Sequence, residues 1–461
     1  MKNRLLGIFL ILQSCIYAQE YVPTYLSKNE VKADLKFLKD KLTNIHPLFL
    51  DQNFNNQWNE QYSEAYTNIP DSMTFNNCYT MFTSLMATLK DGHSNFAFPF
   101  SERVKYMNAE GVTMPFTVEI KNNKIILKEC FDENYYIELV GSEILSINEI
   151  PANKILERLV NFYGDKNIAI INNNIEKYFG AYFWIVYGSF PQYKIDLLKD
   201  GGEFLVTLNA VNNQDYFTLR NKFYPQQTEE KYQLNFINSD SIAYLKIKSF
   251  ADKKVLSDFL DNAFDSIKEK GFKNLIIDVR DNPGGTSDGV DTLLSYLTTE
   301  RYRQYKSIGL RVSNEIKNIY ENKKPELYNM VKHFEDNQLF YYDDTMLVKM
   351  PVHRQNRYNG SLFVLIDDKT FSAASTFAGV IKEYNIGKIV GYSATGGTIE
   401  YYGDFLLFKL PNTKMEFFIS SKHFIQYGGA DLDKGVFPSI KIEENEDIEN
   451  IVKKQKHHDN L

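Results

Sequence analysis

One segment of the chain carries a buried strand directly into a helix. Residues 361–367 read SLFVLID, and residues 370–384 read TFSAASTFAGVIKEY. The first run is short and almost wholly apolar, which is typical of a strand buried on both faces of a parallel sheet. The second run places Phe377 and Ile381 on one face at helical spacing, so that a helix should begin near Ser372. Together they predict a strand–loop–helix unit of an α/β domain.

The segments around this unit alternate between strand and helix. Upstream, SIAYLKIKSF (241–250) and KNLIIDVR (273–280) are predicted strands, and the amphipathic run between them ends at Gly271. Downstream, KIVGYS (388–393) is another predicted strand, whereas residues 300–358 are expected to form a long polar insertion. This succession predicts a mostly parallel sheet with its functional residues at the carboxyl ends of the strands.

The first half of the chain changes its hydrophobic period near residue 112. Before that point apolar residues recur at helical spacing, and Ser27 with Glu30 forms a capping-box pattern. Beyond it the pattern alternates, with hairpin turns predicted at Asn122-Asn123 and Gly201-Gly202. We therefore expect a helical region followed by a β-rich module, with helices interrupting the module near residues 165–190.

The composition is that of a globular protein with two or three domains. The 461 residues are 43% hydrophobic, and the formal net charge is -7 with basic and acidic residues interspersed. This mixture argues against a nucleic-acid-binding protein, which gathers its lysines and arginines into basic patches. The three cysteines, Cys15, Cys78 and Cys130, stand far apart, so we expect at most one disulfide and no metal site.

The first eighteen residues, MKNRLLGIFLILQSCIYA, have the pattern of a secretory signal peptide. A short basic start precedes an apolar core that is too short to span a membrane, and we expect cleavage after Ala18. An alternative interpretation takes LQSC as a lipoprotein signal, which would place a lipid anchor on Cys15. In either case we expect secretion across the inner membrane, to the periplasm or the outer membrane.

Two predicted loops carry residues suited to catalysis. RDNPGGTSDG (280–289) contains Gly284 and Gly285, which can leave backbone N–H groups accessible, although an ordinary tight turn is the alternative. The spacing of these glycines matches no phosphate-binding motif. Ser372 could be a helix cap or a nucleophile, since its oxygen and the N–H of Ala373 would both be exposed at the helix start. We expect it to be both, capping a helix whose first N–H groups stabilise the oxyanion.

A serine nucleophile needs a base, because its free hydroxyl is weak at neutral pH. Of the seven histidines, four lie in the tail or the polar insertion, and His46 lies in the first helical region. This leaves His93 and His423. The segment LKDGHSNF (89–96) places His93 at a helix end among polar residues, which favours a functional role over simple core packing.

Three motifs then suggest a family. LKDGHS (89–94), LIIDVRDNPGG (275–285) and TFSAASTFAGVIKEYNIGKIVGYSATGG (370–397) resemble, in order and spacing, the C-terminal processing peptidase and tricorn-core superfamily of serine proteases. The resemblance covers residues 237–442 closely and residues 27–236 more loosely. Within the looser part, GSEILSINEIPANKILERL is similar to the latter half of a PDZ-like module.

The resemblance implies an α/β catalytic domain with a ClpP/crotonase-like β-α-β core. This serine peptidase domain would occupy residues 237–445. The other expected parts are a signal peptide at 1–18, an N-terminal helical region at 19–108, a degenerate PDZ-like α+β module at 109–236 and a charged tail at 446–461.

The resemblance also implies roles for individual residues. Ser372 falls on the nucleophile, and Ala373 with Gly284 or Gly285 falls on the backbone donors of the oxyanion hole. One branch of the superfamily uses a lysine base, but Gly397 stands at that position. The resemblance is therefore to the tricorn-like, histidine-base branch of these tail-specific protease-like enzymes, whose histidine lies in a D-x-H-[ST] segment that DGHS with His93 matches.

The acid that orients the histidine is expected in GGADLDKGVFPS (428–439). Asp433 is the first choice and Asp431 the alternative, with Glu400 and His423 as candidate supporting residues. The chain departs from the family pattern at Ser375, where many members have Glu, and at Ser439, where they have Asp.

These patterns predict a secreted serine peptidase that hydrolyses unfolded or short polypeptides. The alternative is a non-catalytic peptide- or lipid-binding protein that retains the peptidase fold. The joint presence of Ser372, His93 and the glycine loop favours the enzyme, because a carrier has no need to keep all three. The proposed chemistry requires neither a metal nor an organic cofactor.

Overall fold

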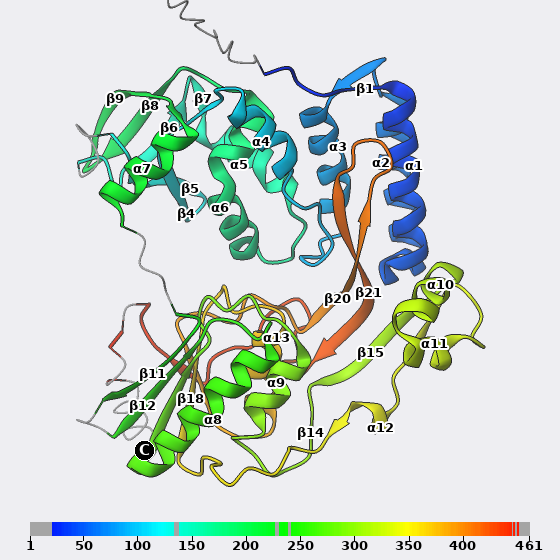
Figure 1. The fold of residues 1–461 in the computed structure, drawn as a ribbon, viewed down its shortest axis with the longest axis vertical. Coiled ribbons are helices and arrows are strands. Elements are labelled where there is room, and N and C mark those ends of the chain that lie inside the picture. The colour runs from blue at the N-terminus through cyan, green and yellow to red at the C-terminus, as the bar shows by residue number, and fades with distance from the viewer. Residues whose placement is uncertain are drawn as a thin grey trace, which may run out of the picture.

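The computed structural model describes residues 21–132, 138–225, 230–237, 241–444, 446–447 and 450. The predicted signal peptide, Cys15 and most of the predicted tail lie outside these ranges. Figure 1 shows two lobes: an upper lobe from the first half of the chain and a lower lobe from the second half. A long hairpin of β20 (Glu400–Lys409) and β21 (Glu416–Gln426) extends from the lower lobe into the upper one.

A six-stranded sheet organises the lower lobe. Its order is β11-β12-β13-β18-β19-β22, and all neighbouring pairs after the antiparallel β11–β12 pair are parallel. The predicted succession of strands and helices is therefore confirmed. The strands are β11 (Tyr232–Ile237), β12 (Ile242–Ile247), β13 (Asn274–Asp278), β18 (Ser361–Ile366), β19 (Lys388–Gly391) and β22 (Ile440–Lys441).

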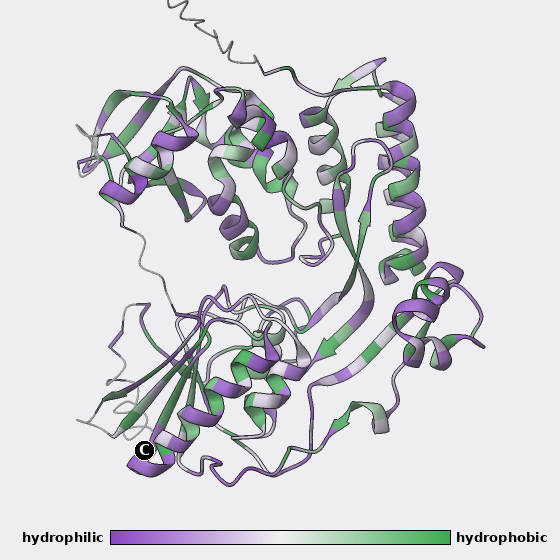
Figure 2. Ribbon diagram, viewed as in Figure 1, coloured by the Kyte–Doolittle hydropathy of each residue, from purple (hydrophilic) through white to green (hydrophobic). Residues whose placement is uncertain are grey.

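Three helices connect these strands: α8 (Lys253–Lys270), α9 (Ser287–Leu294) and α13 (Ala373–Glu383). In Figure 2 the strands are largely green, whereas α8 carries both purple and green residues, as an amphipathic helix on a sheet does. α8 ends at Gly271 in the left-handed conformation that glycine adopts easily. Because strand β18 leads into α13, Ser372 stands at the carboxyl edge of the sheet.

The upper lobe begins with α1 (Lys28–Ile45), α2 (Gln52–Thr67), α3 (Phe75–Ala87) and α4 (Phe100–Asn108). The capping box of Ser27 and Glu30 is confirmed. An antiparallel sheet in the order β4-β5-β6-β8-β9 follows. Its strands and helices are β4 (Phe116–Lys121), β5 (Lys124–Cys130), β6 (Glu143–Ile147), β8 (Gln192–Lys199), β9 (Gly202–Asn209), α5 (Ala152–Leu159), α6 (Ile168–Tyr187) and α7 (Asn213–Phe223).

The two predicted hairpins of this sheet are present. Asn122 and Asn123 both have positive φ, as a tight two-residue turn requires. The second turn lies at Asp200 and Gly201, one residue earlier than the sequence suggested, because β9 already begins at Gly202.

Residues 300–358 are not merely a polar insertion. They contain β15 (Tyr305–Val312), a mostly buried strand of a second sheet in the order β16-β15-β21-β20. The remaining elements are short: β1 (Tyr25–Ser27), β2 (Ser72–Thr74), β3 (Val112–Thr113), β7 (Ile150–Pro151), β10 (Val211–Asn212), β14 (Tyr302–Arg303), α10 (Asn314–Lys323), α11 (Pro325–Val331), β16 (Gln338–Tyr341), α12 (Asp344–Leu347) and β17 (Val348–Lys349).

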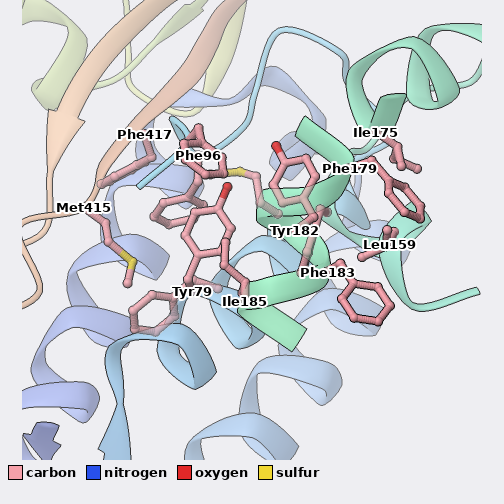
Figure 3. Packing of buried hydrophobic residues seen from close by; sticks show 14 of the residues in the cluster. Tyr79, Phe96, Leu159, Ile175, Phe179, Tyr182, Phe183, Ile185, Met415 and Phe417 are labelled. Atoms are coloured by element: carbon pink, nitrogen blue, oxygen red, sulfur yellow. The ribbon is translucent and has the colours of Figure 1, made fainter. Parts of the chain in front are cut away.

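The far end of the β20–β21 hairpin is part of the upper hydrophobic core. Figure 3 shows Phe417 and Met415 of the hairpin beside Phe96 and Tyr79 of the upper lobe. The rings of Phe96 and Phe417 are 5.3 Å apart. Backbone bonds from Ala97 N to Glu416 O (2.9 Å) and from Phe418 N to Asn95 O (2.8 Å) add to this contact. The hairpin therefore fixes the segment after His93 against the lower lobe.

Neither described cysteine forms a disulfide. Cys78 and Cys130 are buried free thiols, and burial raises the pKa of Cys130 to about 11. Within the described ranges, no helix is both long and apolar enough to cross a membrane.

Candidate active site

The backbone at Ser372 is unusual. Its φ of 50° and ψ of -124° lie outside the conformations that a serine adopts easily, at a cost of about 1–3 kcal/mol. The serine precedes α13 but makes no side-chain capping bond, so its predicted role as a side-chain helix cap is wrong. Its Oγ instead lies 3.0 Å from Nε2 of His93, which stands 279 residues away in the sequence.

The imidazole of His93 is held between two aromatic rings. Phe371 stacks on it with a centroid separation of 5.0 Å, and Tyr401 stacks at 5.7 Å. The side chain is 13% exposed, so the ring is largely shielded but still reaches the site. This packing fixes the plane of the ring with Nε2 toward Ser372.

Asp91 is the carboxylate beside His93. Its Oδ1 accepts the backbone N–H of His93 at 3.0 Å and lies 3.6 Å from Nδ1 of the same residue. Burial opposes the charge of Asp91, but hydrogen bonds from His46 and His93 hold the pKa of its carboxyl well below the usual value. An ionised Asp91 favours a proton on Nδ1 and leaves Nε2 free to accept the serine proton.

The structure places the predicted acid Asp433 elsewhere. Its side chain is 71% exposed and pairs with Nζ of Lys166 at 2.6 Å. In the described part of the chain, no hydrogen bond or ion pair joins Asp433 or Asp431 to His93. Both aspartates lie in a turn after β21, whereas Asp91 lies in the same DGHS segment as His93. Its position two residues before His93 was the signal that could have identified it.

Glu400 and His423 form a separate pair. His423 Nε2 lies 2.8 Å from Glu400 Oε1, and Lys166 approaches the other oxygen of Glu400 at 3.4 Å. Glu400 lines a small cavity of about 20 Å³ with His93, whereas no contact between His423 and His93 occurs among the described residues. Of the two, only Glu400 is near the histidine.

Asp165 is a site-proximal residue that the sequence did not indicate. It lines the same small cavity, and a Cβ at Gly92 would collide with its Oδ2. Burial raises the pKa of Asp165 to about 7. Asp165 follows helix η2 (Val160–Phe162) in a loop that is distant in sequence from the motifs of His93 and Ser372, and no local pattern identifies it.

Two backbone N–H groups beside Ser372 have no hydrogen-bond partner among the described residues: those of Ala373 and Gly285. Both residues line a cavity of about 500 Å³ with Ser372 and His93. The N–H of Gly284, by contrast, donates to Oδ1 of Asn282 at 2.8 Å. Of the two predicted glycine donors, Gly285 is therefore the one that remains available to an oxyanion.

Gly284 has a different role, because its lack of a side chain allows the glycine loop to lie close to Ser372. Its φ is +98°, and a Cβ there would lie 2.8 Å from Cβ of Ser372. The two loops are also joined by Phe371 N to Asn282 O (2.9 Å) and Thr370 Oγ1 to Val279 O (2.9 Å). These contacts hold the glycine loop against the start of α13.

The 500 Å³ cavity is lined mainly by aromatic and small residues. Tyr401 stacks on Phe424, with Tyr305 against the same ring. One end is charged, where Lys422 and Asp404 form an ion pair of 2.8 Å. The other lining residues are Thr286, Ser287, Ile308, Gly403 and Phe405.

Part of this chain is similar to a known peptidase family. Residues 241–442 match the model of Peptidase family S41. This segment, which is less than half of the chain, is similar to members of that family. The match supports a serine-type peptidase, an enzyme class that acts on polypeptides. A search of curated protein sequences finds no match.

Solved structures share the fold at low sequence identity. The crystal structure of mature CPAF has a TM-score of 0.64 at 15% identity, covering 90% of this chain and 92% of that one. Mature CPAF complexed with lactacystin gives 0.63 at 15% identity, covering 90% of this chain and 94% of that one. This likeness shows a mixed α/β peptidase fold.

The S41 segment of this chain has no room for a lysine beside the serine. A Cβ at Gly397 would lie 2.8 Å from Cβ of Ser375 and 3.0 Å from N of Ser372. Ser375 is buried and donates to Gly397 O at 2.9 Å, with Gln426 donating to its hydroxyl at 3.0 Å. A neutral hydrogen-bonded cluster thus occupies the space next to the predicted nucleophile.

Proposed function

We propose that this chain is a secreted serine peptidase that hydrolyses unfolded or short polypeptides, with Ser372 as nucleophile and His93 as base. The single observation that carries the proposal is the 3.0 Å distance between Ser372 Oγ and His93 Nε2. A hydrogen bond of this length between a serine and a histidine from distant segments fits nucleophile activation.

The proposed reaction is acyl transfer in two steps. Ser372 Oγ attacks the peptide carbonyl carbon while His93 Nε2 takes the serine proton, and the N–H groups of Ala373 and Gly285 stabilise the oxyanion. The C–N bond then breaks as His93 returns the proton to the leaving amine. Water, deprotonated by His93, hydrolyses the acyl-enzyme and regenerates the serine.

The surroundings of Ser372 suit an extended chain rather than a folded protein. The serine lies in a cavity of about 500 Å³ that is lined by the second half of the chain together with His93, and its aromatic lining offers apolar surface to one or a few side chains. A folded domain could not bring a peptide bond to a serine in such a cavity without local unfolding. The substrates proposed are therefore short or unfolded polypeptides.

We also propose the division of the chain that the sequence suggested. The helical region (19–108) and the module at 109–236, which we interpret as PDZ-like, belong to the upper lobe except for the end of the module, because β11 (Tyr232–Ile237) pairs with β12 in the lower sheet. The peptidase domain, expected at 237–445 with a ClpP/crotonase-like core, therefore begins with β11. A signal peptide at 1–18 directs secretion to the periplasm or the outer membrane, with or without a lipid on Cys15.

Labelling with a fluorophosphonate tests the catalytic proposal without a known substrate. The purified wild type should be labelled on Ser372, and Ser372→Ala and His93→Ala should abolish the labelling. Ser361→Ala is the matched control, because Ser361 begins the same strand–helix unit with an exposed side chain. A folded wild type that resists the reagent at every pH would contradict the proposal and favour a protein that binds peptides or lipids without turnover.

A further inference from the structure

His46 is a buried histidine with both ring nitrogens hydrogen-bonded. It lies between α1 and helix η1 (Pro47–Leu50) and has no exposed surface. Its Nδ1 accepts the N–H of Leu48 at 3.1 Å, and its Nε2 lies 3.1 Å from Oδ2 of Asp91. Because a backbone amide can only donate, Nδ1 is unprotonated and the neutral ring carries its proton on Nε2. His46 therefore donates to Asp91.

The carboxylate of Asp91 is held by donors from three segments. Oδ2 accepts from His46, from Ser94 Oγ at 2.5 Å and from Ser420 Oγ at 2.6 Å. Oδ1 is left to face His93. The donors on Oδ2 come from the end of α1, the loop of His93 and strand β21, so the carboxylate cannot rotate without breaking several bonds.

We propose that His46 is a positioning residue of the catalytic centre, which keeps Asp91 ionised and aimed at His93. The inference rests on the proposed function, in which His93 is the base for Ser372. Among the described residues, no hydrogen bond or ring contact joins His46 to Ser372, and its ring packs against Tyr402 with a centroid separation of 4.7 Å. It acts through Asp91, whose charge favours the His93 tautomer that accepts the serine proton.

The pH profile of the labelling reaction reports this role, because labelling requires neutral His93. The other charged groups that face His93 are Lys90, Asp165, Lys166 and Glu400 on one side, and Asp404 and Lys422 across the large cavity. A substitution at His46 changes none of these groups. The acid limb is the low-pH side of this profile, where the labelling rate falls. A shift of the acid limb in a His46 variant therefore reports the contact with Asp91.

Two matched variants distinguish loss of the hydrogen bond from His46 to Asp91 from loss of the packing of the His46 ring. His46→Asn retains an acceptor for Leu48 N–H but is too short to reach Asp91, whereas His46→Gln retains an N–H that can reach it. We expect His46→Asn to lower the labelling rate constant about 10- to 100-fold and to move the acid limb to lower pH. His46→Gln should recover most of the rate and the wild-type limb.

The inference is overturned if folded His46→Asn keeps the wild-type rate and acid limb. It is also overturned if both variants lose rate equally with an unchanged limb, since that is the pattern of a packing role. Should His46→Asn not fold, ¹⁵N-histidine spectra of the wild type decide, because a proton on Nδ1 of His46 would contradict its donation from Nε2 to Asp91. Failure of the wild type to label Ser372 would instead contradict the proposed function.

Discussion

Replacing Asp91 by Asn should nearly abolish nucleophile activation while leaving most of the fold intact. Oδ2 of Asp91 accepts three side-chain donors, so the single oxygen of the amide should take that place. The NH₂ group would then face the backbone N–H and the Nδ1–H of His93. Because an NH₂ group only donates, it could not accept either hydrogen bond. His93 would have to place its proton on Nε2, and that nitrogen would donate to Ser372 instead of accepting from it.

The expected loss is about 10⁴-fold in the rate of labelling, or about 5.5 kcal/mol in the activation free energy, as for a triad whose histidine holds the wrong tautomer. The assay is the second-order rate constant for fluorophosphonate labelling at about pH 8, with a thermal melt to confirm folding. Asp433→Asn is the matched control. Its exposed pair with Lys166 should matter little, with a change within about twofold. A folded Asp91→Asn protein that labels within tenfold of wild type would refute the role of Asp91.

Three further predictions concern the donors, a buried acid and the thiols. Gly285→Ala should slow labelling about 10²- to 10³-fold, because its Cβ would collide with neighbouring backbone and displace one oxyanion donor, whereas Gly202→Ala has room and should not; equal rates would remove Gly285 from the oxyanion hole. Burial raises the pKa of Asp165 to about 7, so its stability contribution is present at low pH and is lost as pH rises from about 4 to 7. Asp165→Asn should therefore raise Tm more at pH 8 than at pH 4, and the reverse order would refute the buried charge. Cys78 and Cys130 should react with a thiol reagent only on unfolding, and fast reaction of either in the native protein would contradict their burial.

Much of the lower lobe could be predicted because its signals are local. The strand at 361–367, the helix after Ser372 and the helix that ends at Gly271 each follow from apolar spacing and end signals within about twenty residues. β15 was missed because Lys306, Ser307 and Gly309 interrupt its apolar pattern, and its burial depends on pairing with β21.

The centre of the site was only partly predictable. Ser372 and His93 were found because each stands at a helix end in a distinctive polar motif. The contacts of Asp91 were not, since one of its partners, Ser420, lies 329 residues away. His46 appeared to belong to an ordinary helical region, and nothing within that segment indicates that its ring faces Asp91. The contact with Ser420 arises from docking of the β20–β21 hairpin, and the contact with His46 arises from packing within the upper lobe. Neither leaves a local pattern in the sequence.

The division of Ser372 and His93 between two lobes has a consequence for engineering. The segment that matches the peptidase family begins at residue 241, so it lacks His93 and the carboxylate behind it. Expressed alone, that segment would be an inert half-enzyme, and the first half of the chain would be inert as well. A chain cut between the lobes would regain reactivity only when the two pieces reassociate, which would make it a split reporter of its own assembly.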